Sequence, residues 1–162
     1  MVNAVLTRAV QSVFRQRADA DEIVPGLWVG SAPSSVQVAA LVSAGIDAVV
    51  DLRAEDDAVR RTWPRHVAVY LEPLRDHGTP SIAELRRAAV ALSDLTGSGR
   101  TVLVHCHAGV ERAPTVACAA LVLQGWSLED AYRRVTEVRP VAAPTDGQLA
   151  SVRALATLIR TD

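Results

Sequence analysis

The sequence predicts a single α/β domain built around an open sheet, with a helical C-terminal half. Three observations support this prediction. Short β-branched segments alternate with amphipathic helical segments along most of the chain. A length of 162 residues suits one hydrophobic core. Hydrophobic residues make up 49% and charged residues 22%, which is typical of globular domains and excludes disordered and fibrous proteins.

The first segment, residues 1–20, is predicted to be an amphipathic helix. Apolar residues recur there at helical spacing, and arginines lie on the other faces. Such a helix either packs on the domain or lies on a membrane surface, and we expect it to pack on the domain. The domain itself is then expected to span residues 21–162.

An extended segment, a helix and two strands are predicted next. Residues 23–31 read as one short extended segment with a turn at Pro25-Gly26, and residues 36–44 read as a helix ended by Gly45. The β-branched run 46–52 predicts a strand, and residues 67–71 predict another.

The second half is expected to be mainly helical. Ser81 and Glu84 form a capping box for a helix ending near Gly97, whose apolar stripe is Ile82, Leu85, Ala89, Leu92 and Leu95. The short apolar run 101–104 is typical of a central strand buried on both faces. Three further helices are predicted over 113–123, 127–138 and 147–160.

Charge and sequence features limit the classes of function. A net charge of −1 argues against a nucleic-acid partner. All 17 basic residues are arginine, which suggests a high-GC bacterial coding bias. The chain shows no secretion signal and no apolar stretch of membrane-spanning length, so we expect a cytoplasmic protein. The two cysteines, Cys106 and Cys118, are too few for a disulfide scaffold.

The chemistry is expected in the loop after the central strand. It reads His105-Cys106-His107-Ala108-Gly109-Val110-Glu111-Arg112-Ala113-Pro114. Backbone N–H groups between a buried strand and a helix N-terminus can converge on one oxyanion, and Gly109 allows a backbone that a side chain would block. The same positive potential favours a thiolate, which predicts that Cys106 is a nucleophile. Arg112 offers a planar fork for two phosphate oxygens.

A cysteine and an arginine separated by five residues resemble the motif of the protein tyrosine phosphatase superfamily, and the surroundings resemble its compact dual-specificity branch. Four other segments, at residues 23–31, 45–53, 125–132 and 139–140, are similar to that branch in the same order. The resemblance implies a three-layer fold with a central, mostly parallel sheet flanked by helices, here with an extra N-terminal helix.

The resemblance also implies roles for site residues. Cys106 attacks phosphorus to form a phosphocysteine, the loop from His107 to Arg112 binds the phosphate, and His105 supports the loop. The segment Leu74-Arg75-Asp76-His77-Gly78-Thr79-Pro80 is similar to the family's acid loop, so Asp76 is expected to be the general acid and base. No metal or other cofactor is implied.

Two positions depart from the family pattern. Ala113 replaces the usual serine or threonine after the arginine, as in the phosphatases of regenerating liver and plant glucan phosphatases, and this predicts a slow second step. Residues 144–148 only approximate the family's C-terminal Pro-Asn segment and following glutamine, so Gln148 is left outside the predicted site.

The expected substrates are phosphoproteins, with phosphotyrosine first and phosphoserine or phosphothreonine as further substrates, and glycan phosphates stay open as an alternative. Glu111, and the absence of basic residues other than Arg112 from the loop, argue against inositol phosphates. A monomer is expected. Two alternatives stay open: a phosphate-binding pseudophosphatase or partner-docking module with little turnover, and a rhodanese-type sulfurtransferase.

Overall fold

A computed structural model describes residues 17–54 and 63–161. The predicted N-terminal helix over 1–20 lies outside the described residues except for its last four, and of these Ala20 begins the first strand. No helix in the described ranges is long and apolar enough to cross a membrane.

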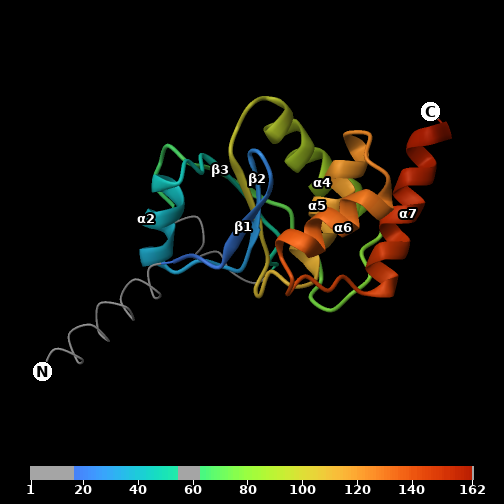
Figure 1. Ribbon diagram of the computed structural model, residues 1–162, viewed down its shortest axis with the longest axis horizontal. Helices are drawn as coiled ribbons and strands as arrows, with labels where there is room; N and C mark the ends of the chain where they lie inside the picture. The colour runs from blue at the N-terminus through green and yellow to red at the C-terminus, as the bar shows by residue number, and fades with distance from the viewer. Residues whose placement is uncertain (1–16, 55–62, 162) are drawn as a thin grey trace, which may run out of the picture.

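The sheet has five strands in the order β1-β2-β5-β3-β4 (Figure 1). Their bounds are β1 Ala20–Val24, β2 Leu27–Gly30, β3 Ala48–Asp51, β4 Ala68–Leu71 and β5 Val102–His105. All neighbouring pairs are parallel except β1 and β2, which form an antiparallel hairpin. The predicted central strand is confirmed, since β5 lies in the middle of the sheet and all four of its residues are buried.

Helices cover both faces of this sheet, which confirms the three-layer prediction. The helix α2 (Ser35–Ser43) packs on one face, where Val38 and Leu41 contact Val49 and Leu103. The other face is covered by α4 (Ile82–Gly97), α5 (Arg112–Leu123) and α6 (Leu128–Val138), and α7 (Asp146–Thr161) packs against these three helices. Side chains of alternate parity along β3 and β5 therefore enter two separate cores.

The helices α2 and α4 begin directly after serine residues that cap their N-termini. Ser81 accepts a hydrogen bond from the Glu84 backbone N–H, and the Glu84 side chain accepts one from the Ser81 N–H, so the predicted capping box is present. Ser34 and Gln37 form a second capping box at α2. One stripe residue differs from the prediction: Ile82 is 36% exposed, because it occupies the first turn of α4, beyond the edge of the core.

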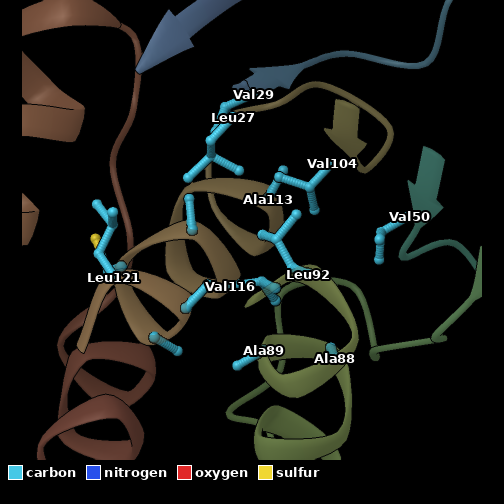
Figure 2. Close-up of a cluster of buried hydrophobic side chains, with 14 of the residues drawn as sticks. Leu27, Val29, Val50, Ala88, Ala89, Leu92, Val104, Ala113, Val116 and Leu121 are labelled. Carbon is cyan, nitrogen blue, oxygen red and sulfur yellow. The ribbon is translucent and has the colours of Figure 1, made fainter. Parts of the chain in front are cut away.

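The larger core fixes the position of α5. Residues from the sheet, among them Leu27, Val29, Val50 and Val104, pack against α4 and α5 (Figure 2). Eleven of the twelve residues of α5 are buried, and its many alanines allow close approach to α4, α6 and α7. The N-terminus of α5 is thereby held beside the carboxyl end of β5, with only residues 106–111 between them.

Candidate active site

The loop between β5 and α5, residues 106–111, holds the predicted nucleophile at the carboxyl edge of the sheet. Cys106 is 3% exposed, and its Sγ accepts a hydrogen bond of 3.2 Å from the Gly109 N–H. A donor this close stabilises the negative charge of a thiolate. Gly109 has φ +66°, in the left-handed region that favours glycine.

Every backbone carbonyl of this cysteine loop is bonded on the outside. The donors to these carbonyls come from five residues elsewhere in the chain. His105 Nδ1 donates to Cys106 O, Ala32 N to His107 O, Arg139 to Ala108 O and Gly109 O, Ala143 N to Val110 O, and Thr115 to Glu111 O. With the carbonyls turned outward, the N–H groups are left for a ligand inside the loop. Such a ring of donors suits a tetrahedral oxyanion.

Arg112, in the first turn of α5, lies next to the cysteine loop, and its side chain is 2% exposed. Nη1 donates to the carbonyls of Leu52 and Leu74 at 3.4 and 3.2 Å, and Nη2 lies 2.9 Å from Asp76 Oδ1. Its Nε is buried and has no hydrogen-bond partner. A buried donor without an acceptor is costly, so the position of this N–H suits a site that binds an oxyanion.

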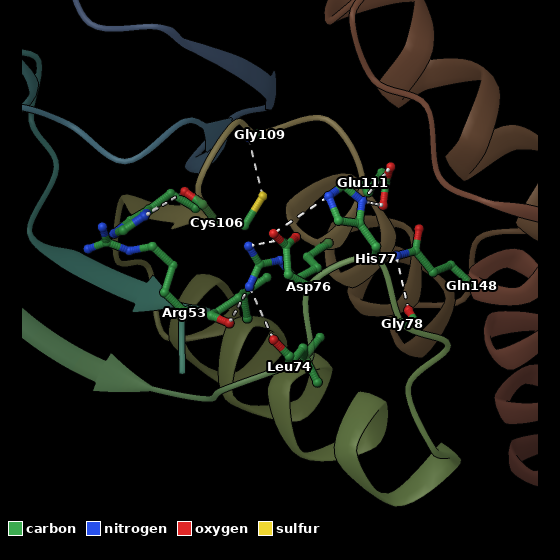
Figure 3. A network of polar contacts seen from close by, with 12 residues as sticks. Arg53, Leu74, Asp76, His77, Gly78, Cys106, Gly109, Glu111 and Gln148 are labelled. Atoms are coloured by element: carbon green, nitrogen blue, oxygen red, sulfur yellow. Dashed lines mark hydrogen bonds and ion pairs between the residues drawn. The ribbon is translucent and has the colours of Figure 1, made fainter. Parts of the chain in front are cut away.

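Asp76 lies on the acid loop, residues 74–80, within the segment that connects β4 to α4. Its side chain is 47% exposed and faces the guanidinium of Arg112 (Figure 3). Two contacts anchor the second half of the loop to α7: Gln148 Nε2 donates to Gly78 O at 3.3 Å, and Ser151 Oγ donates to Pro80 O at 2.9 Å.

His105 is fully buried behind the nucleophile. Its Nδ1 donates to the carbonyl of Cys106 at 3.3 Å and lies 3.8 Å from Asp51 Oδ1, while Arg53 forms an ion pair with Asp51. Desolvation lowers the pKa of His105, so the imidazole is neutral at pH 7. The predicted supporting residue therefore contacts the main chain of Cys106.

The structure gathers the predicted residues around one pocket of about 250 Å³, lined by Asp76, His77, Cys106, His107, Ala108, Val110, Glu111 and Arg112. Gly109 contributes its N–H to Cys106. Sequence reasoning missed three residues that contribute to the site. His77 lies at the pocket mouth, Gln148 of α7 donates a hydrogen bond to the acid loop, and Arg139 bonds to the cysteine loop from behind. Among the described residues, no cluster of three or more His, Cys, Asp or Glu side chains converges as metal ligands would.

The family model for the dual specificity phosphatase catalytic domain matches residues 27–157. The chain belongs to the dual specificity phosphatase family. Human dual specificity protein phosphatase 12 is 30% identical over 133 residues, which cover 78% of this chain and 38% of that protein. Mouse protein phosphatase Slingshot homolog 3 is 29% identical over 143 residues, covering 87% of this chain and 22% of that protein. The matched regions thus span less than half of either relative.

Solved structures agree with this family. A mouse putative dual specificity phosphatase, solved in complex with zinc tungstate, superposes with a TM-score of 0.77 and 26% identity, covering 90% of this chain and 91% of that chain. The predicted dual-specificity-phosphatase fold is therefore confirmed.

One support of this dual specificity phosphatase domain links the cysteine loop to the edge strand β1 through Arg139, the residue that follows α6. Arg139 is 1% exposed; its Nε donates to Gly109 O, and its Nη1 pairs with Asp21 in β1 and with Asp19 just before it. The hydrogen bond from Arg139 lowers the pKa of Asp19. Because the folded pKa lies below the unfolded one, this stabilisation is present above about pH 3.8 and is lost as the pH falls through the folded value.

Asp19→Asn is expected to lower stability at pH 7, because the charged partner of Arg139 is removed. The deficit relative to the native chain should shrink as the pH falls from about 3.8 through the lower pKa that Asp19 has in the folded chain, because this carboxyl group is then protonated in the native chain as well. Urea denaturation midpoints at pH 7, 4 and 3 measure this. Asp94→Asn, at an exposed position of α4, is the matched control. An equal deficit at all three pH values would contradict the prediction.

The two cysteines of the dual specificity phosphatase domain should differ in reactivity. Cys118 is fully buried in α5, and burial raises the pKa of its thiol to about 12, so it stays protonated at pH 7. Cys106 lines the pocket, where an anionic alkylating agent meets Arg112. We expect iodoacetate to modify one thiol per native chain, and none in Cys106→Ser. Peptide mass spectrometry locates the adduct; labelling of Cys118 in the native state would refute this.

Proposed function

We propose that this chain is a cysteine-dependent phosphatase that hydrolyses phosphate monoesters on proteins. The observation that carries the proposal is the unpaired, buried Nε of Arg112 beside a loop whose carbonyls are all bonded on the outside. Such a site holds donors without acceptors, and a phosphate group supplies the acceptors. The mouse relative's complex with zinc tungstate, a salt of a tetrahedral oxyanion, supports the same ligand class.

The reaction proceeds in two displacements. The thiolate of Cys106 attacks phosphorus, the bond from phosphorus to the ester oxygen breaks, and Asp76 gives its proton to the leaving oxygen. Water then attacks the phosphocysteine, Asp76 takes a proton from that water, and the sulfur leaves as thiolate with inorganic phosphate as product. Arg112 and the loop N–H groups stabilise the equatorial oxygens in both transition states.

The substrate class follows from the charges at the pocket. Glu111 lines it, and the cysteine loop together with Arg112 carries no lysine and no second arginine. A second phosphate beside the first would meet Glu111 without a compensating cation. Single phosphomonoesters on proteins, with phosphotyrosine first and phosphoserine or phosphothreonine next, fit this site best.

A monomeric, cytoplasmic enzyme of bacterial source remains part of the proposal.

The deciding experiment is hydrolysis of p-nitrophenyl phosphate in the presence of a chelator. Turnover should be lost in Cys106→Ser, and Asp76→Asn should remove the basic limb of the pH profile, because the protonated acid is no longer required. Acid quenching should trap a phosphate ester on Cys106. Metal-dependent turnover that survives Cys106→Ser would refute the proposal.

Ala113 motivates the second candidate, a phosphate-binding pseudophosphatase. It is fully buried and follows Arg112, where the family usually has a hydroxyl that helps the sulfur to leave. A burst of one p-nitrophenol per chain followed by slow turnover is expected of the enzyme, whereas the pseudophosphatase gives no burst. Thiosulfate-to-cyanide transfer without any role for Asp76 would instead identify a rhodanese-type sulfurtransferase.

Ala113→Ser is expected to raise the steady-state rate by about tenfold, the value of one hydrogen bond to a charged sulfur. The burst rate should stay the same, because the hydroxyl acts in the second displacement. Ala117→Ser, one turn further along and equally buried, is the matched control. Stopped-flow measurement of both phases separates the two steps, and a change confined to the burst would contradict this assignment.

A further inference from the structure

We propose that His77 and Glu111 form a bridge that holds the acid loop on the cysteine loop and positions Asp76 for proton transfer. The proposal rests on the function proposed above, since it assigns positioning residues to the same site. Neither residue touches the reacting atoms through this bridge. Both act by fixing where the carboxyl group of Asp76 lies.

The His77–Glu111 bridge joins the two segments that carry the chemistry. His77 Nδ1 lies 3.3 and 3.4 Å from the two carboxylate oxygens of Glu111, and His77 Nε2 lies 3.7 Å from Asp76 Oδ2 (Figure 3). The imidazole thus stands between two carboxylates from different loops. Glu111 directly precedes Arg112, and His77 directly follows Asp76, so the bridge connects the neighbours of the acid and the arginine.

The backbone of His77 is held in an uncommon conformation. With φ +53°, it is the only non-glycine residue with positive φ in the described part of the chain. Its side chain is 80% exposed, so burial does not maintain this conformation. His77 lies in a turn in which the Gly78 N–H donates to Arg75 O at 3.4 Å, and in this turn its imidazole reaches Glu111.

The bridge matters most when a phosphate is bound. At its start the acid loop is tied through Leu74, whose carbonyl accepts from Arg112, and at its end through Gly78 and Pro80. Between these anchors, Asp76 contacts Arg112, but that carboxyl group must turn to the leaving oxygen during catalysis. The His77–Glu111 bridge does not use the phosphate-binding donors, so it can persist through the reaction.

The test compares aryl phosphates whose leaving groups depend differently on the acid. In His77→Ala, kcat for phenyl phosphate should fall about tenfold, while kcat for p-nitrophenyl phosphate should fall no more than about twofold, because nitrophenolate leaves without much protonation. KM should not rise for either substrate. Glu111→Gln, which keeps an acceptor but removes the charge, should show the same pattern at smaller size, about threefold for phenyl phosphate.

Two controls make the result specific. His66→Ala removes another exposed histidine, in the turn before β4, and should leave both substrates unaffected. In an Asp76→Asn background, His77→Ala should cause no further loss, because the group it positions is already absent. Equal losses on both substrates, or an additional loss in the Asp76→Asn background, would overturn the positioning role.

Failure of the proposed function would be visible separately, as absence of Cys106-dependent turnover in the native chain. The bridge is then still judged by backbone ¹⁵N relaxation. The amides of Asp76 and His77 should gain nanosecond motion in Glu111→Gln, whereas that of His66 should not. Unchanged relaxation of Asp76 and His77 would overturn the bridge itself.

Discussion

Arg112→Lys is expected to lower kcat/KM for a phosphate monoester by about a thousandfold, although the positive charge is retained. The guanidinium acts in three directions at once: Nη1 holds the carbonyls of Leu52 and Leu74, Nη2 faces Asp76, and Nε is left for the ligand. A lysine ammonium has three donors on one atom and cannot reach all these positions. Steady-state kinetics on p-nitrophenyl phosphate measure the loss.

The control for this substitution is Arg86→Lys, at an exposed position of α4, which should leave the kinetics unchanged. Affinity for vanadate, measured by inhibition, should fall in Arg112→Lys along with kcat/KM, because ground-state and transition-state oxyanions share the donor. A loss smaller than tenfold would mean that charge alone accounts for the role of Arg112.

Gly109→Ala is expected to destabilise the fold by about 2–4 kcal/mol and to reduce turnover at least a hundredfold. A Cβ there would lie 2.5 Å from the Gly30 carbonyl carbon and 2.7 Å from Arg139 Nη2, on a backbone already at φ +66°. The backbone of Gly30 at the end of β2 and the buried side chain of Arg139 cannot move away easily. The cysteine loop must therefore shift. That shift displaces the N–H that bonds to Cys106.

Substitutions at two other glycines separate the two causes of the expected destabilisation, which are backbone strain and the clash of the added Cβ. At Gly125, φ is +96° and a Cβ meets nothing within 4 Å, so Gly125→Ala measures backbone strain alone, about 1–2 kcal/mol. At Gly97, no positive φ occurs and the space is open, so Gly97→Ala should be neutral or slightly stabilising. Urea denaturation and kinetics on the three variants check this order. If Gly109→Ala behaves like Gly125→Ala, the close contact with Gly30 has no energetic consequence.

Sequence patterns predicted best what depends on near neighbours. Ser81 and Glu84 are three residues apart, so the capping box could be recognised directly, and the Cys106 to Arg112 spacing lies within one loop. The apolar run at residues 101–104 indicated a strand buried on both faces, as β5 is. These signals need no knowledge of the tertiary structure.

Contacts between distant segments left no such signal. Residues 23–31 were expected to be extended with a turn at Pro25-Gly26, and they do turn there, between β1 and β2. The start of β1 at Ala20 was missed, because the polar residues of an edge strand that pairs on one side give no alternating pattern. The role of Arg139 depends on Asp19, 120 residues away. Gln148 was predicted to lie outside the site, yet it donates to the acid loop, because α7 passes beside Gly78.

The ion pairs of Arg139 also bear on where the domain can be cut for expression. The family match starts at residue 27, inside the hairpin, and would suggest a shortened chain that begins there. That chain would lack Asp19 and Asp21, leaving a buried guanidinium without its carboxylates beneath the cysteine loop. Recombinant fragments and fusion junctions should therefore keep β1 and the residues just before it, even though these lie at the far end of the sequence from the chemistry.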